Sequence, residues 1–116
     1  MDGGWMNAAE LPAVVTAFLT AQEAREADVA LDLLAANAVV TDDGKTYQGA
    51  DEIRAWLVGA ASEYTYTTSV TGVAIVDSRH YDVLHHLEGD FPGGVVDLHY
   101  RFTLDGGSIS RLVIEP

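Results

Sequence analysis

The sequence predicts an α+β domain in which three N-terminal helices pack on one face of a curved antiparallel sheet. Two observations predict this class. Apolar residues recur with a helical period before Ser62 and alternate with a period of two after it. In the second half, the turn-forming segments GDFPGG and DGG separate runs that alternate as strands do. Because the helices come first and the strands follow, the two kinds of element are expected to form separate layers.

The first expected helix carries one apolar stripe. Its members recur at i, i+3, i+4, i+7 and i+8, and they are Leu11, Val14, Val15, Phe18 and Leu19. Pro12 fits only near the start of this helix, where its missing N–H does little harm. Asn7 with Glu10 forms a candidate capping pair upstream.

Two further helices are expected. One runs from Asp28 to Ala36, with Asp28 near its positive end. Its buried side is formed by Ala30, Leu33 and Leu34. The other follows Gly49 and has Asp51 and Glu52 in its first turn. Its apolar face is formed by Ile53, Trp56, Leu57 and Ala60.

Four segments after the helices alternate as the strands of an antiparallel meander do, and a short strand or arm is expected at 39–47. The first segment is rich in β-branched and aromatic residues, and one of its faces holds Tyr64, Tyr66, Thr68 and Val70. Segments 80–88 and 95–104 flank GDFPGG, and the last strand is Ser108–Ile114.

The GDFPGG connection determines the register between segments 80–88 and 95–104. If it is the whole loop, Glu88 pairs with Val95. The outer face then has two pairs of complementary charge: His86 with Asp97, and Asp82 with Arg101. The inner face has three pairs: Leu87 with Val96, His85 with Leu98, and Val83 with Tyr100. His85 therefore interrupts an otherwise apolar inner face.

Composition limits the partners of the chain. Its 116 residues predict one domain with one core, and the absence of cysteine excludes disulfides and thiolate metal sites. The net charge of −12 would be repelled by nucleic-acid phosphates and anionic lipids, so no nucleic acid and no membrane is expected as a partner. No apolar run approaches the ~20 residues that span a bilayer. Because the N-terminal residues lack the regions of a signal peptide, a cytoplasmic protein is expected.

Three segments carry a resemblance to a known superfamily: LPAVVTAFLTA, LLAANAVVTDDGKTYQGADEIRAWL and GDFPGGVVDLHYRFTLDGGSISRLVIEP. With the order of the elements, they resemble the nuclear transport factor 2-like superfamily, and within it the SnoaL-like (polyketide cyclase / ketosteroid isomerase-like) domains. The resemblance implies an N-terminal tail at 1–10 and a single SnoaL-like domain at 11–116. It also implies a cone with an internal pocket, in a fold that hosts many unrelated activities.

Asp42 is the first candidate catalytic residue. Aligning VVTD with the equivalent strand of ketosteroid isomerase implies that Asp42 stands where that family keeps its general base. An apolar wall would raise the pKa of this carboxyl and make it a better base near neutral pH. The alternative is that Asp42 only hydrogen-bonds nearby backbone in the turn. Asp43 is expected to face solvent and to belong to the turn.

The resemblance also argues against steroid-type isomerisation. The isomerase uses two oxyanion donors, a tyrosine on the first helix and a protonated aspartate on a late strand. The matching positions here are Phe18 and Leu98, and neither side chain can donate a hydrogen bond. Asp97 is adjacent to Leu98 but is expected on the opposite face of the sheet.

His85 is the second candidate catalytic residue, because a neutral imidazole in an apolar wall needs partners for its nitrogens. It is either a core histidine satisfied by backbone or by a hydroxyl such as that of Tyr66, or an acid–base or ligand-orienting group opposite Asp42. Burial is expected to lower its pKa unless Asp42 compensates.

No metal and no organic cofactor is expected. His85 and His86 are adjacent on a strand, so they point to opposite faces and cannot share an ion. A salt-bridged surface accounts better for His86, Asp97 and His99 than a metal site does. The sequence also has no Gly-x-Ser-x-Gly elbow and no Gly-x-x-x-x-Gly-Lys loop.

The sequence thus predicts a pocket for a small apolar or aromatic molecule. The residues expected to line it are Phe18, Trp56, Tyr66, Val83, Leu98 and Tyr100. The preferred function is a cofactor-independent cyclase, isomerase or dehydratase, with Asp42 as base and His85 as acid or carbonyl-polarising donor. The alternative is a non-catalytic ligand-binding or dimerisation module, which the missing oxyanion donors favour. The mixed outer face and the resemblance together imply a homodimer formed through the sheet.

Overall fold

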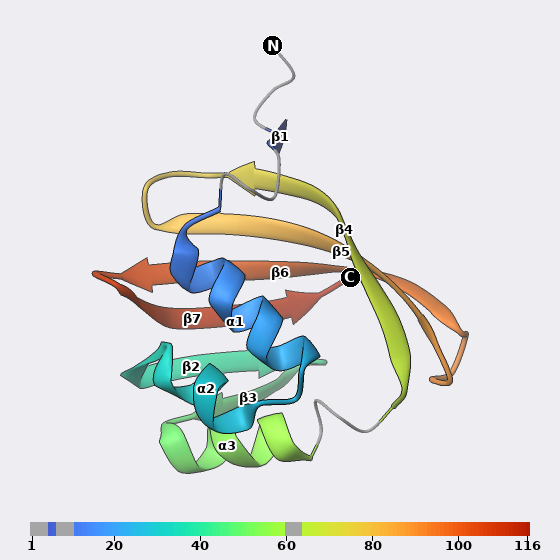
Figure 1. The fold of residues 1–116 in the computed structure, drawn as a ribbon, viewed down its shortest axis with the longest axis horizontal. Helices are drawn as coiled ribbons and strands as arrows, with labels where there is room; N and C mark the ends of the chain where they lie inside the picture. Colours follow the sequence, from blue (N-terminus) through green and yellow to red (C-terminus); the bar gives the residue numbers. More distant parts are fainter. Residues whose placement is uncertain (1–4, 7–10, 60–63) are drawn as a thin grey trace.

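The computed structural model of the chain describes residues 5–6, 11–59 and 64–116. The described residues form three helices on one face of a curved seven-stranded sheet, which confirms the predicted α+β class (Figure 1). The helices are α1 (Ala13–Glu23), α2 (Ala27–Asp32) and α3 (Ala50–Val58). The strands are β1 (Trp5–Met6), β2 (Leu34–Asp42), β3 (Lys45–Gln48), β4 (Tyr66–Ile75), β5 (His80–Gly89), β6 (Val95–Asp105) and β7 (Ser108–Glu115).

α1 and α3 form where the apolar periodicity predicts them. Pro12 immediately precedes α1, and its carbonyl oxygen accepts hydrogen bonds from the N–H groups of Val15 and Thr16, at 3.0 and 3.2 Å. α3 follows Gly49, whose φ of 84° is in the region that favours glycine. The buried residues are Val15, Phe18 and Ala21 on α1, and Ile53, Trp56 and Leu57 on α3. Asn7, Glu10 and Ala60 lie outside the described residues.

The second helix is shorter than predicted. α2 ends at Asp32, and residues 34–36 belong to β2, so the predicted helix end at Ala36 was wrong. Leu34 pairs with Ile109 of β7, and the register between the two strands shifts before Val39. The alanine-rich segment has a high helix propensity, but pairing with a strand from the far end of the chain decides its conformation.

The sheet order is β1-β4-β5-β6-β7-β2-β3, and the predicted meander is its central part, β4 to β7. The sheet is antiparallel except between β2 and β7, which are parallel. β2 and β3 form a hairpin through Asp43 and Gly44, whose φ angles of 53° and 75° are those of a type I′ turn. Asp43 is exposed and lies in the turn, as predicted.

The register between β5 and β6 is the predicted one. Glu88 pairs with Val95, and His85 pairs with Leu98 on the inner face. On the outer face, His86 Nδ1 lies 2.7 Å from Asp97 Oδ1. The alternation and the GDFPGG loop were therefore sufficient to place His85 toward the helices.

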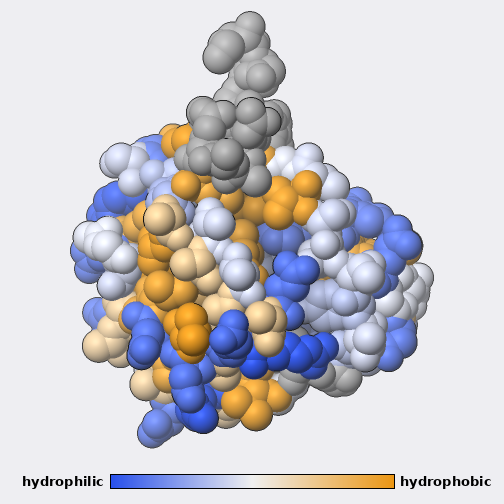
Figure 2. Space-filling view, in the orientation of Figure 1, coloured by the Kyte–Doolittle hydropathy of each residue, from blue (hydrophilic) through white to orange (hydrophobic). Residues whose placement is uncertain are grey.

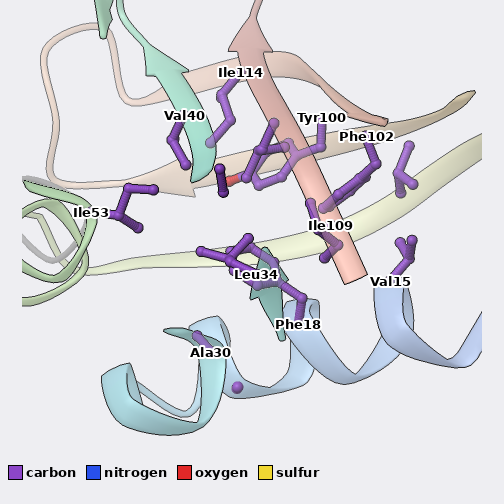
Figure 3. Packing of buried hydrophobic residues seen from close by; sticks show 14 of the residues in the cluster. Val15, Phe18, Ala30, Leu34, Val40, Ile53, Tyr100, Phe102, Ile109 and Ile114 are labelled. Atoms are coloured by element: carbon purple, nitrogen blue, oxygen red, sulfur yellow. The ribbon is translucent and has the colours of Figure 1, made fainter. Parts of the chain in front are cut away.

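The core lies between the helices and the inner face of the sheet, and every main element contributes to it (Figure 3). Its largest fully buried side chains are Trp56, Phe18, Phe102, Ile53, Ile109 and Leu112. In residues 11–59 and 64–116, no helix has the length and hydropathy that crossing a membrane requires.

Candidate functional site

Two neighbouring cavities lie beside the core. One, here named the Asp42 cavity, has a volume of about 510 Å³ and is lined mainly by the β2–β3 hairpin, β6, the end of β7 and the loop between β5 and β6. The other, the His85 cavity, has a volume of about 560 Å³ and is lined mainly by α1, α2, β4 and β5. Gln22, Tyr66 and Tyr100 belong to the walls of both. Each volume is in the range of small-molecule sites, ~300–1,000 Å³.

Asp42 ends β2 and lines the Asp42 cavity, where it is half-buried. Its Oδ2 accepts a hydrogen bond of 2.9 Å from the indole N–H of Trp56. Within the described residues, its side chain makes no hydrogen bond to the turn backbone, and Oδ1 has no partner. Burial raises the pKa of Asp42 above its ordinary value of 3.8, the Trp56 hydrogen bond opposes this, and the charge of Asp43 adds to it. The site therefore presents a tethered carboxylate with one free oxygen.

Trp56 of α3 fixes the position of this carboxylate through the hydrogen bond from its indole N–H. It is 1% exposed on the buried face of α3, and a buried indole N–H needs an acceptor, which Asp42 supplies. Trp56 lines neither of the two cavities, although it was expected to line the pocket. A tryptophan on the buried face of a predicted helix signals that an acceptor is nearby, but it does not identify Asp42.

Tyr66 of β4 and Tyr100 of β6 bring two hydroxyl groups to the wall between the cavities. Neither hydroxyl has a hydrogen-bond partner in the part of the chain that the structure describes. Burial raises the pKa of Tyr100, and the nearby Tyr66 and Asp42 add to the effect. Burial also raises the pKa of Tyr66, Arg25 opposes this, and the charge of Asp42 adds to it. Both phenols therefore stay protonated at neutral pH and can donate hydrogen bonds.

The sequence interpretation expected Tyr66 and Tyr100 to line the pocket, but it did not consider their hydroxyls as possible oxyanion donors. It considered donors only at the positions of Phe18 and Leu98, which are apolar. In Figure 3 the hydroxyl oxygen of Tyr100 (red) lies on the side of the ring nearer to Val40 of β2, the strand that carries Asp42. The sequence feature that could have indicated these hydroxyls is the presence of tyrosine, not phenylalanine, on an otherwise apolar inner face.

His85 is 4% exposed, and its ring packs on Tyr100 with 4.1 Å between the ring centroids. Its Nδ1 lies 3.2 Å from the carbonyl oxygen of Val83. Because a carbonyl can only accept, Nδ1 carries the proton and donates, and Nε2 of the neutral ring is an acceptor. Burial lowers the pKa of His85, and the bond to Val83 opposes this. At neutral pH Nε2 of the ring is thus suited to accept a hydrogen bond.

Asp42 and His85 line different cavities, whereas the sequence interpretation placed them opposite each other in one pocket. Of the other expected lining residues, Leu98 lies in the wall of the Asp42 cavity. Phe18 packs edge-on against Phe102 in the core at a centroid distance of 6.0 Å, and Val83 is fully buried. Neither of these two side chains reaches the cavities described here.

The family follows from comparison of the whole sequence. The model of the SnoaL-like domain matches residues 15–112. The chain belongs to the SnoaL-like domain family. Comparison with curated proteins gives no match.

Solved structures place this SnoaL-like domain in the nuclear transport factor 2-like fold. A candidate polyketide cyclase from Sinorhizobium meliloti is 32% identical, with 95% of this chain and 100% of that chain covered and a TM-score of 0.86. A Catenulispora acidiphila protein with a ketosteroid isomerase-like fold, bound to trimethylamine, is 19% identical over 90% and 85% of the chains, with a TM-score of 0.77. A Mycobacterium tuberculosis protein bound to estradiol-17β-hemisuccinate is 15% identical over 87% and 88%, with a TM-score of 0.72. The last two show the fold alone.

The outer face of the SnoaL-like domain holds ion pairs. His86 bonds Asp97 and Glu88, at 2.7 and 2.9 Å, while His99 bonds Asp82 at 2.9 Å. The described residues contain no group of three or more side chains arranged to hold a metal ion.

The pKa values of the two adjacent histidines, His85 and His86, are expected to shift in opposite directions from the ordinary value of 6.5. The pKa of buried His85 is lowered, and the pKa of exposed His86 is raised by its hydrogen bonds to Asp97 and Glu88. His85 therefore destabilises the fold as the pH falls below 6.5, because the unfolded chain then binds the proton more tightly. His86 stabilises the fold below 6.5, and this contribution is lost as the pH rises through its folded pKa.

A ¹⁵N NMR titration of the imidazoles, with assignments from His85→Phe and His86→Phe, measures both values. If His85 titrated like a free imidazole, it would lie in solvent and the inner-face assignment would be incorrect.

Proposed function

We propose that this SnoaL-like domain is a cofactor-independent enzyme that moves protons on a small apolar carbonyl compound, in the class of cyclases, isomerases and dehydratases. One observation carries the proposal: the tethered carboxylate of Asp42 and the hydroxyls of Tyr66 and Tyr100 belong to the wall of one cavity of about 510 Å³. A base and hydrogen-bond donors in one cavity are what enolisation of a carbonyl compound needs.

The chemistry follows from the state of each group. Asp42 Oδ1 takes a proton from the carbon next to the carbonyl group, and the electrons of the broken C–H bond move to the carbonyl oxygen. Tyr66 and Tyr100 donate hydrogen bonds to this oxygen as its negative charge develops. If a carbon–carbon double bond adjoins the deprotonated carbon, the resulting dienolate takes the proton back from Asp42 at the far carbon, which is isomerisation. If a second carbonyl group is within reach, the enolate carbon attacks it and the new alkoxide takes the proton from Asp42, which is cyclisation. Trp56 keeps Oδ2 occupied, so the free oxygen is the one that reacts.

A second function, binding without catalysis, is favoured by one observation: Asp42 and His85 do not share a cavity. Relatives of the fold bind small molecules, namely trimethylamine and a steroid hemisuccinate. The candidate polyketide cyclase among the similar structures supports the enzyme instead.

Hydrogen–deuterium exchange separates the two functions without knowledge of the natural substrate. The probe is 2-tetralone, an apolar bicyclic ketone with acidic C–H groups, incubated with the protein in D₂O and followed by ¹H NMR. An enzyme of the proposed class accelerates loss of the C–H signals above the buffer rate, in proportion to protein concentration. Binding of 2-tetralone without any acceleration would establish the binding module in place of the enzyme.

We expect the SnoaL-like domain to form a two-fold dimer through the outer face of the sheet. This face combines the ion pairs of His86 and His99 with apolar side chains such as Leu84, half-buried, and Val95, 59% exposed. In a two-fold dimer each such patch meets its own copy. Light scattering at micromolar concentration should give twice the 12.4 kDa mass of one chain.

The matched variant is Leu84→Glu, which adds a negative charge to both sides of the expected interface. It should shift the population to monomers. A wild-type protein that is monomeric at micromolar concentration would rule the dimer out.

A further inference from the structure

The wall of the His85 cavity contains a hydrogen-bond acceptor that no described residue satisfies. His85 is 4% exposed, and its Nδ1–H is used by the carbonyl oxygen of Val83. Nε2 has a lone pair and no hydrogen-bond partner in residues 11–59 and 64–116. A polar atom left without a partner in an apolar wall costs free energy, so such atoms in native proteins usually meet water or a ligand.

A second polar group without a partner lies beside it. Thr68 Oγ1 is buried and has no hydrogen-bond partner within the described residues. Thr68 pairs with Leu87, and the next inward-facing residue of β4, Val70, pairs with His85. Thr68 and His85 are thus diagonal neighbours on two paired strands, and both line the His85 cavity. The threonine hydroxyl can donate as well as accept, whereas Nε2 of the neutral imidazole only accepts.

The other wall residues of the His85 cavity restrict the polarity and the charge of a ligand that could bind there. Apolar wall residues include Leu19, Ala30 and Leu57. Around the C-terminal end of α1 the surface is hydrophilic (Figure 2), and the residues there include Glu23, Arg25 and Glu26, with two negative charges against one positive charge. With a net charge of −12 on the chain, this opening disfavours anions.

We propose that the His85 cavity is a binding subsite for an uncharged, hydroxyl-bearing apolar ligand, whose hydroxyl donates to His85 Nε2 and accepts from Thr68 Oγ1. A hydroxyl is the simplest uncharged group that can do both. A carbonyl oxygen only accepts and would leave Nε2 without a partner, and an ammonium only donates. Thr68 reaches the hydroxyl by a rotation about χ1 that turns Oγ1 into the cavity. The proposal rests on the binding of small apolar molecules by this fold, and it is independent of the role of Asp42 as a base.

The residues shared by the two cavities connect this subsite with the site of the proposed reaction. Tyr66 and Tyr100 border both cavities, so an elongated ligand with its hydroxyl at His85 has its other end close to the tyrosine hydroxyls. The substrates expected are therefore hydroxylated carbonyl compounds in which an apolar segment separates the two oxygen functions.

The test compares two probes of similar shape, 2-naphthol and 2-methylnaphthalene, which differ by a hydroxyl in place of a methyl. Their dissociation constants are measured for the wild type and for two variants. His85→Phe keeps an aromatic ring at position 85, and Thr68→Val keeps the shape of the threonine side chain. His85→Phe should weaken 2-naphthol binding by ~10-fold, the effect of one buried hydrogen bond, and change 2-methylnaphthalene binding by less than ~3-fold. Thr68→Val should act in the same direction. Adding 2-naphthol to the wild type should also shift the ¹⁵N resonance of His85 Nε2.

His86→Phe, on the outer face, is the control and should leave both dissociation constants unchanged. The proposal is overturned if His85→Phe weakens both probes equally, if it leaves 2-naphthol binding unchanged, or if neither probe binds the wild type and the Nε2 resonance stays in place. Because the exchange assay on 2-tetralone reports on Asp42, that proposal can fail while the hydroxyl preference remains, and the reverse is also distinguishable.

Discussion

Replacing Asp42 with asparagine is expected to lower the rate of deuterium exchange into 2-tetralone by ~10²–10⁴-fold, the usual contribution of a positioned base. Asparagine has nearly the same size, and its amide oxygen can still accept the hydrogen bond from Trp56 Nε1. The substitution removes the charge and the basicity, and it leaves the shape of the cavity wall. Binding of 2-tetralone should therefore change little while exchange is lost.

The same substitution should leave the protein equally stable or more stable at pH 7. The folded-state pKa of Asp42 is raised above 3.8, so the fold loses stability as the pH rises from 3.8 through that pKa, and the full cost is present at neutral pH. Urea unfolding of the wild type and Asp42→Asn should show the largest difference at pH 7 and a vanishing one at or below pH 3.8.

Asp43→Asn is the matched control. Asp43 is exposed in the hairpin turn with a φ of 53°, a conformation that asparagine also adopts readily, so both exchange and stability should be retained. An Asp42→Asn protein that exchanges 2-tetralone as fast as the wild type would exclude Asp42 as the base. A lower melting temperature of Asp42→Asn with an unchanged exchange rate would show that Asp42 stabilises the fold and has no part in exchange.

Replacing Tyr100 with phenylalanine is expected to lower the exchange rate by ~10²–10³-fold, the cost of removing one donor to a developing oxyanion. The ring is retained, so its contact with His85 and its place in the core are preserved. Since the hydroxyl has no hydrogen-bond partner in the described residues, its removal should leave the free energy of unfolding unchanged or slightly higher.

The control for this substitution is Tyr81→Phe. Tyr81 donates to the carbonyl oxygen of Ser78 at 3.2 Å and lines neither cavity, so its variant should exchange 2-tetralone at the wild-type rate. If Tyr100→Phe retained full exchange and Tyr66→Phe lost it, Tyr66 would be the donor. If both variants were fully active, the oxyanion role of the tyrosines would be refuted.

Much of the fold was predictable because its signals are local. The apolar stripe of α1, the glycine and acidic residues at the start of α3, and the alternation in β5 and β6 each act within a few residues. The GDFPGG loop between β5 and β6 was sufficient to determine which residues pair, and this placed His85 on the inner face. The selection of Asp42 as a candidate base depended on the resemblance, since the residues alone left turn chemistry as the more common alternative.

The errors arose where distant segments compete with local preference. Residues 34–36 favour a helix by composition, but β7, about 75 positions later, offers them a strand partner (Leu34 pairs with Ile109). The sequence also could not show that Asp42 and His85 line two neighbouring cavities, because strand faces show which side of the sheet a residue occupies and not how the space on that side is divided.

The sequence by itself determined the α+β class, the order of the elements, the β5–β6 register and the inward position of His85, since periodicity and turn chemistry are properties of neighbouring residues. Only the tertiary structure decided that Trp56 tethers Asp42, that Tyr66 and Tyr100 bring hydroxyls to the walls of both cavities, and that His85 donates to Val83 and keeps Nε2 as an acceptor. The physical reason is that each of these features depends on which side chains from separate elements meet when the core closes, and on how burial then shifts their protonation. Both the contacts and the protonation states depend on distances between atoms, and the spacing of residues along the sequence does not give those distances.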